Sequence, residues 1–258
     1  MMKKSILVAS LLLAGGAMAD STEIPVDGVL GVMPISVPAG KTDVIVSVPW
    51  VGATNDMVAV SNLVKTAGLT PGNGETTISL YNIDETNFTV WNLETRGGIN
   101  HWVEANEVSS DTPVAKQGES LILSVTNGLA DVTTFYVVGH VGTNRYVQTT
   151  IKGAKDSSTP TYNLLAPPCA TNVAVNVNEF FKTIEGSIHN DDQIVVDTLG
   201  SMTLRFVREY DDEAKAYKWV NEYGTTVPTI PAGRGFWYKR CHTSDLTITW
   251  EAPYVSIQ

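Results

Sequence analysis

The amino-acid sequence predicts a mainly β protein, built as two tandem domains of similar β-sandwich or barrel-like fold, each with one short helix. Apolar and polar residues alternate over short segments such as 44–48 and 246–250, which is typical of strands with one buried face. Turn signals separate these segments, for example at residues 71–74 and 127–128. An internal repeat indicates that one set of strands occurs twice.

The first residues have the features of an export signal. Lys3 and Lys4 precede an apolar run over residues 5–14, and Ala17 and Ala19 form a small-x-small cleavage signal. The apolar run is too short to span a membrane. We therefore expect a cleaved signal peptide over 1–19 and a short tail over 20–26. The mature chain, with no transmembrane segment, is then delivered to the periplasm, the cell surface or the extracellular space.

Length and charge exclude some classes of protein. The chain has 258 residues, of which 43% are hydrophobic, so it can bury a large core. Its formal net charge is −10. Because phosphate binding requires a basic face, this balance argues against a nucleic-acid partner.

The internal repeat has a period of about 117 residues. Four segments match in the same order, with nearly constant spacing. The matched pairs are 42–50 with 161–169, 60–66 with 177–183, 101–104 with 218–221, and 116–123 with 231–238. We therefore expect one β-rich repeat domain over 27–141 and a second over 142–258.

Each copy also contains one predicted short helix, because apolar residues recur at positions i, i+3, i+4 and i+7. The two apolar stripes are Val60, Leu63, Val64 and Ala67 in the first copy, and Val177, Phe180, Phe181 and Ile184 in the second. Gly68 and Gly186 follow at the position of a C-terminal cap.

Cys169 and Cys241 are the two cysteines of the chain. An even pair in an exported protein favours one disulfide, since the compartment is oxidising. Two buried free thiols and a metal site are the alternatives. A metal site has little support, because the sequence contains neither a CxxC nor an HxxxH pattern.

Signatures of catalysis are missing from the sequence. It contains no G-x-S-x-G elbow, HExxH motif, Walker A loop or EF-hand loop. Asp191 and Asp192 follow His189 in a polar loop that could hold Ca²⁺ or serve an acid–base pair. A polar loop before a strand at Ile194 explains the same residues without a function, and we prefer this interpretation. We expect no enzyme activity and no cofactor.

Aromatic residues are the other candidate for a site. Trp237 and Tyr238 are consecutive on a predicted strand, so their rings point to opposite faces of the sheet. A ring that reaches solvent can stack on a sugar or anchor a partner. We therefore name Trp237 and Tyr238 as candidate binding residues.

Three phrases of the sequence carry a resemblance to a known group of proteins. They are residues 28–33, residues 46–50, and the segment 230–238, which reads I-P-A-G-R-G-F-W-Y. The chain resembles uncharacterised exported two-copy β-repeat proteins of anaerobic bacteria, in which a "PAG-x-G-F-W" strand closes a copy. The first copy departs from this phrase at 116–121. The resemblance implies an exported all-β architecture and no known activity.

These observations lead to three hypotheses about function. The first is a non-enzymatic structural protein of the cell surface or extracellular space, capable of self-association. The second is a glycan- or protein-binding β module that presents exposed aromatic residues. The third is a hydrolase that uses the acidic loop at Asp191 and Asp192. The expected partners are a second copy of the chain, or a surface glycan or protein.

Overall fold

The structure is a computed structural model in which strands dominate and no helix occurs among the described residues. The prediction of a mainly β protein is therefore confirmed. The described residues are 30–37, 39–40, 43–50, 57–59, 69, 71–72, 75–82, 87–105, 114–125, 133–141, 146–175, 183–185, 188–197, 203–221 and 229–251.

The first nine strands form what we call the N-terminal unit. They are β1 (Leu30–Val37), β2 (Asp43–Ser47), β3 (Met57–Ala59), β4 (Thr76–Asn82), β5 (Asn87–Arg96), β6 (Ile99–Glu104), β7 (Val114–Lys116), β8 (Ser120–Val125) and β9 (Thr133–His140). The main sheet has the order β2-β8-β4-β5-β6, and β1 pairs with β9 and β3 with β7. Every pairing is antiparallel.

The remaining strands form the C-terminal unit. They are β10 (Tyr146–Ile151), β11 (Thr161–Leu165), β12 (Val173–Ala174), β13 (Thr183–Glu185), β14 (Gln193–Asp197), β15 (Thr203–Asp211), β16 (Ala216–Asn221), β17 (Thr229–Ile230), β18 (Phe236–Arg240) and β19 (Leu246–Glu251). The main sheet has the order β11-β18-β14-β15-β16, a second sheet has the order β10-β19-β13, and β12 pairs with β17. These pairings are also antiparallel.

The two units have matching strand orders. The sheet β2-β8-β4-β5-β6 has the same order as β11-β18-β14-β15-β16 when β2 is matched with β11 and the later strands follow in chain order. The pairs β1-β9 and β3-β7 then correspond to β10-β19 and β12-β17. Each unit has its own hydrophobic core. Leu93, Leu121 and Trp102 are buried in the first core, and Phe206, Phe236 and Trp219 in the second. Trp102 and Trp219, which the repeat pairs, are therefore both core residues.

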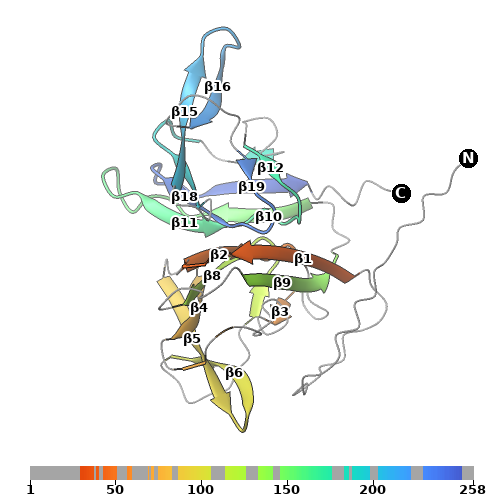
Figure 1. Cartoon of the computed structure of the whole chain (residues 1–258). Coiled ribbons are helices and arrows are strands. Elements are labelled where there is room, and N and C mark those ends of the chain that lie inside the picture. Colours follow the sequence, from red (N-terminus) through yellow and green to blue (C-terminus); the bar gives the residue numbers. More distant parts are fainter. Residues whose placement is uncertain are drawn as a thin grey trace, which may run out of the picture.

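The units meet at reciprocal contacts between a sheet edge of one unit and a turn of the other (Figure 1). In one contact, the Ser47 amide donates to the Gly233 carbonyl at 3.0 Å. In the other, the Ala166 amide donates to the Gly118 carbonyl at 3.2 Å. The positions correspond, because Ser47 ends β2, Ala166 directly follows β11, and each acceptor precedes β8 or β18. Each contact therefore places a turn of one unit against the end of an edge strand of the other, which restricts pairing with another chain there.

Glycine is required at these turns for two different reasons. Gly118 and Gly233 have φ values of +88° and +78°, a left-handed conformation that side chains with a Cβ rarely adopt. At Gly235 the reason is space, because a Cβ would lie 2.2 Å from Ser120 Oγ and 2.5 Å from Ile45 Cγ2. The Gly-rich phrase before β18 is thus an element of the contact between the units.

The first predicted helix, over residues 60–67, lies outside the described residues, as does most of the second. Ile184, the last apolar residue of the second stripe, lies in strand β13 and pairs with Ile248. The helical prediction is therefore wrong at this end. Strand β19 pairs with β10 on one side, and its other side offers backbone hydrogen bonds to residues 183–185, which outweigh the helical periodicity of the sequence.

We predict that Gly235→Ala lowers the free energy of unfolding by about 3 kcal/mol, because the added methyl group overpacks the contact between the units. Urea denaturation measures this loss. The control is Gly98→Ala at the β5–β6 turn, where a Cβ would meet nothing within 4 Å and only the positive φ of +80° opposes it. Its expected cost is about 1 kcal/mol. Equal losses in the two variants would contradict a packed interface at Gly235.

Candidate functional site

A groove lies where the outer face of the N-terminal sheet meets the C-terminal unit. It has a volume of about 290 Å³. We call it the aromatic groove, and its lining residues are Asp43, Ile45, Ser79, Phe88, Ile122, Ser124 and Trp237. Strands β2, β8, β4 and β5 supply the first six residues, and β18 of the other unit supplies the tryptophan. The groove therefore exists only when the two units are docked.

The rings of Phe88 and Trp237 line one wall of this groove, and the Tyr81 ring packs against both. The Trp237 ring lies 5.9 Å from the ring of Tyr81 and 6.1 Å from that of Phe88, both in edge-to-face geometry. Phe88 and Tyr81 also contact each other at 5.2 Å. Trp237 remains partly exposed and Phe88 is 39% exposed. Each ring thus keeps surface that a ligand can contact.

A hydrogen bond between the units holds this wall in place. The Tyr81 hydroxyl donates to the Tyr162 carbonyl of β11 at 2.6 Å. Partial burial raises the pKa of Tyr81, so the hydroxyl remains protonated and able to donate. The Tyr81 ring is therefore positioned by both units.

Polar groups lie on the floor of the groove. The Ser124 hydroxyl donates to Asp43 Oδ1 at 2.6 Å, and Ser79 contributes a further hydroxyl. The hydroxyl groups of Ser79 and Ser124 and the Asp43 carboxylate therefore give the groove a polar floor. Apolar rings beside hydroxyl and carboxylate groups suit a ligand with both an apolar face and hydroxyl groups.

The two candidate aromatic residues have different environments. Trp237 points out of the sheet into the aromatic groove, as the alternation of the strand requires. Tyr238 points inward and is fully buried, so its ring offers no surface to a ligand. Burial, reinforced by the nearby carboxylate of Asp192, raises the pKa of Tyr238 well above its usual range.

Asp192 is the centre of a buried polar cluster. Its Oδ2 accepts from Arg240 Nη1 at 2.8 Å, from the Tyr238 hydroxyl at 3.0 Å and from the His189 amide at 3.0 Å. Its Oδ1 accepts from the Cys241 amide at 2.7 Å. The side chains of Asp192 and Arg240 are both 0% exposed. This carboxylate is therefore committed to the structure of the unit.

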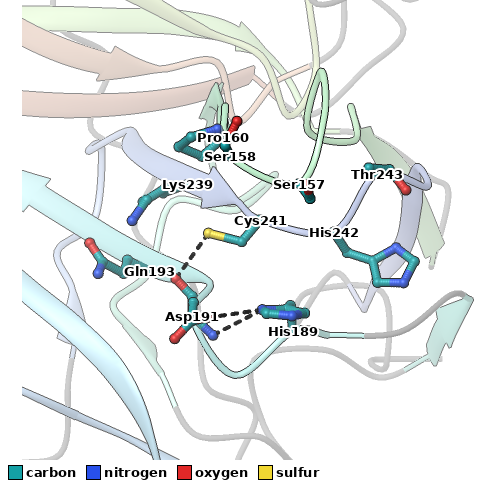
Figure 2. Close-up of a pocket in the computed structure, with 10 residues that line it drawn as sticks. All are labelled: Ser157, Ser158, Pro160, His189, Asp191, Gln193, Lys239, Cys241, His242 and Thr243. Carbon is teal, nitrogen blue, oxygen red and sulfur yellow. Dashed lines mark hydrogen bonds and ion pairs between the residues drawn. The ribbon is translucent and has the colours of Figure 1, made fainter.

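Asp191, in contrast, lines a second cavity of about 500 Å³. We call it the histidine cavity because His189 and His242 both lie in its wall (Figure 2). Their ring centroids are 6.3 Å apart. Each ring accepts a backbone N–H at Nδ1, from Asp191 at 3.2 Å and from Ser244 at 3.1 Å. In the neutral form, each imidazole therefore carries its proton on Nε2.

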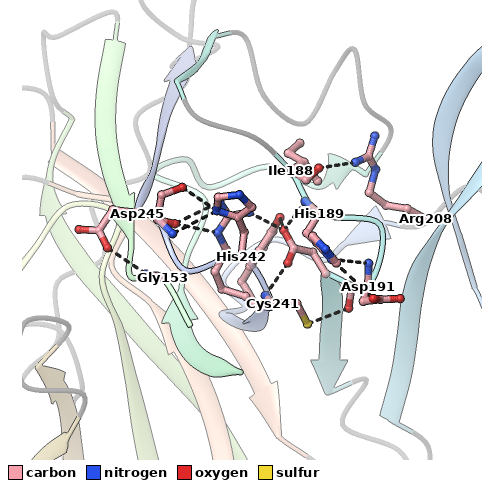
Figure 3. Close-up of polar contacts among 12 residues, drawn as sticks. Gly153, Ile188, His189, Asp191, Arg208, Cys241, His242 and Asp245 are labelled. Carbon is pink, nitrogen blue, oxygen red and sulfur yellow. Dashed lines mark hydrogen bonds and ion pairs between the residues drawn. The ribbon is translucent and has the colours of Figure 1, made fainter. Parts of the chain in front are cut away.

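Cys241 lines the same cavity. Its thiol donates to the Asp191 carbonyl at 3.2 Å (Figure 3). Burial raises the pKa of Cys241, with further contributions from Asp192 and Asp191. The thiol is consequently protonated near neutral pH, whereas thiolate is the nucleophilic form. Among the described residues, no group of three or more histidine, cysteine and acidic side chains has the geometry of a metal site.

The predicted disulfide is wrong, because Cys169 and Cys241 are both free thiols. Strands β11 and β18 are antiparallel, with Leu165 opposite Phe236 at one end and Thr161 opposite Arg240 at the other. Cys169 lies beyond the first end and Cys241 beyond the second. A five-residue ladder is about 14 Å long, whereas a disulfide needs Cα atoms within about 7 Å.

Several residues that line these sites could not be predicted from the sequence. Phe88, Ser79 and Asp43 lie on three different strands, and no local pattern joins them to Trp237. Arg240 did carry a signal, since it alternates with the buried Phe236 and Tyr238. A charged residue in such a register requires a buried partner, which could have pointed to a structural role for one of the two aspartates.

No family model matches the chain, and neither the curated proteins nor the solved structures gave a match. The resemblance to exported two-copy β-repeat proteins therefore remains a prediction. Over its described part, the chain has no helix with the length and hydrophobicity of a membrane span.

We predict that Asp192→Ala lowers the free energy of unfolding by about 3–5 kcal/mol, because it leaves the buried Arg240 without its counter-charge. The control is Asp191→Ala, since that side chain is 78% exposed and its loss is expected to cost less than about 0.5 kcal/mol. Thermal and urea unfolding of both variants measure the difference. A stable Asp192→Ala protein would contradict the structural role assigned to the carboxylate.

Proposed function

We propose that this chain is an exported, non-enzymatic protein that binds carbohydrate in the aromatic groove. The observation that carries the proposal is the position of the partly exposed Trp237 ring, opposite a floor with the Asp43 carboxylate. Sugars present C–H faces that stack on aromatic rings and hydroxyl groups that bond to carboxylate and hydroxyl oxygens. The groove offers both on strands, which hold side chains more rigidly than loops.

The dimensions of the groove suit a small part of a glycan. Its volume of about 290 Å³ lies near the lower end of the range for ligand pockets. The groove is open and shared between two units, so a glycan can extend beyond the one sugar residue that the groove holds. A terminal or internal residue of a longer glycan fits this geometry.

Two further features belong to the same proposal. The matching strand orders and the four matched sequence segments support an origin of the two units by duplication, as tandem domains over 27–141 and 142–258. The export signal over 1–19, which lies outside the described residues, supports a location beyond the inner membrane. Glycans are abundant in that location.

We predict that Trp237→Ala weakens carbohydrate binding by about tenfold or more, because the ring supplies the stacking surface. A glycan array identifies the ligand, and calorimetry then compares the variant with the wild type. Tyr146→Ala is the matched control, since Tyr146 is 53% exposed on β10 and lies outside the groove. The bound glycan should be recovered unchanged, and its turnover would overturn the non-enzymatic assignment.

Self-association is a second proposal, which rests on the sheet edges. The contact between the units places turns against the ends of β2 and β11, whereas β6 and β16 are the outer strands of the two main sheets, at opposite ends of the molecule (Figure 1). An exposed edge strand can pair with a strand of another chain. End-to-end pairing of copies would then produce a fibre.

We predict that the purified protein forms ordered fibres at high concentration, which negative-stain electron microscopy and light scattering detect. A proline at Lys218 in β16 should abolish them, because Lys218 pairs with Glu209 and proline disrupts the backbone geometry of this outer strand. A monodisperse monomer at every concentration tested would refute self-association and leave the carbohydrate proposal unaffected.

A further inference from the structure

The hairpin formed by β15 and β16 carries an aromatic ladder on its inner face. Tyr210 lies directly opposite Tyr217, and Arg208 lies opposite Trp219. The two tyrosine rings are 5.2 Å apart in edge-to-face geometry. Both remain accessible, with 49% of Tyr210 and 36% of Tyr217 exposed.

A cation and an amide accompany these rings. The Arg208 guanidinium lies 4.5 Å from the centroid of the Tyr217 ring. Asn190 Nδ2, from the loop before β14, donates to the Tyr217 hydroxyl at 3.2 Å. We call Arg208, Tyr210, Tyr217 and Asn190 the tyrosine ladder. It combines stacking surface, a positive charge and an amide within one patch.

Asp192 acts electrostatically on Arg208, but its ion pair is with Arg240, and no ion pair joins Arg208 to a carboxylate in the described part of the chain. Nη1 donates to the Ile188 carbonyl at 3.0 Å (Figure 3). Nε is buried without a hydrogen-bond partner, and no carboxylate of the described residues forms an ion pair with this guanidinium. Partial burial lowers the pKa of Arg208, as expected for a desolvated cation. A bound anion would therefore be stabilised here.

Nearby acidic side chains are directed elsewhere. Asp211 accepts from the amides of Glu213 and Ala214 and from Lys218 Nζ at 2.9 Å. These contacts lower the pKa of Asp211 and raise that of Lys218. Glu209 alternates with Arg208 and so points to the other face of the hairpin. Glu209 therefore does not repel an anionic ligand bound on the face of the ladder.

The matching hairpin of the N-terminal unit shows that the fold does not require this ladder. In β5 and β6, Leu93 lies opposite Trp102, as Arg208 lies opposite Trp219. The next pair on that face is Thr95 with Asn100, which a hydrogen bond of 2.8 Å joins. The same hairpin geometry therefore accommodates a small polar pair, and two exposed tyrosines are a specialisation of the C-terminal unit.

We propose that the tyrosine ladder binds an acidic saccharide, with the sugar ring against Tyr210 and Tyr217 and its carboxylate beside Arg208. The rings recognise the C–H face of the sugar, and the guanidinium recognises the carboxylate. This site goes beyond the proposed function, because it lies on the inner face of the sheet whereas Trp237 points from the outer face. Ligand binding at one site does not require the other.

The test transfers the residues of the first hairpin to the second. Oligogalacturonate binding is measured by calorimetry for the wild type, Arg208→Leu, and the double variant Tyr210→Thr with Tyr217→Asn. We expect each change to weaken binding by about tenfold or more. The methyl ester of the same oligosaccharide should also bind about tenfold more weakly, because it lacks the charge. Circular dichroism and thermal unfolding verify that the variants fold.

Two control variants separate this site from other surfaces. Tyr146→Thr removes an exposed tyrosine on β10, and this variant should bind oligogalacturonate as the wild type does. Trp237→Ala removes the aromatic ring of the groove and reports whether the groove takes the same ligand. A loss in Trp237→Ala with none in the ladder variants would assign the ligand to the groove and overturn the present site.

Three further outcomes would also overturn the proposal. They are no measurable binding of oligogalacturonate, alginate oligomers or hyaluronate, equal binding of the acid and its methyl ester, and binding of a polyglutamate peptide in place of any saccharide. The last outcome would indicate an acidic protein partner. None of them bears on the effect of Trp237→Ala on the glycan that the array identifies, so the two proposals can fail separately.

Discussion

The reciprocal contact between sheet edges and turns is the constraint on which the rest of this structure depends. A five-stranded sheet leaves unpaired backbone groups on its outer strand, and these groups need partners. In this molecule each unit supplies the partner for the other, through the amides of Ser47 and Ala166 and the carbonyls of Gly233 and Gly118. Because the two turns follow the same backbone path, glycine with positive φ is needed in both. One solution, used twice, thus restricts pairing at two edges.

This docking also creates the aromatic groove. Trp237 belongs to β18, and the turn just before that strand is the one held against β2. Because Trp237 points outward from β18, its ring lies against the rings of Phe88 and Tyr81 of the other unit. A single unit would hold only half of the lining. The proposed carbohydrate binding in the groove then depends on the stability of the interface.

The two units differ most where the core no longer constrains them. Trp102 and Trp219 have the same place in their hairpins and are both buried. Beyond them, Thr95 and Asn100 in one hairpin correspond to Tyr210 and Tyr217 in the other. Packing restricts the buried positions, because volume changes in a core cost free energy. The exposed end of a hairpin carries no such cost, so it can acquire a binding role in one unit alone.

Local sequence patterns determined the mainly β character of the chain and the opposite orientation of Trp237 and Tyr238, because the two-residue period of a strand is a property of neighbouring residues. Only the tertiary structure decided that Asp192 is a buried partner of Arg240, that Cys169 and Cys241 lie at opposite ends of a ladder, and that Ile184 lies in a strand. Each of these outcomes depends on which distant strand becomes a neighbour. Strand pairing joins residues far apart in the chain, and no spacing within one segment encodes it.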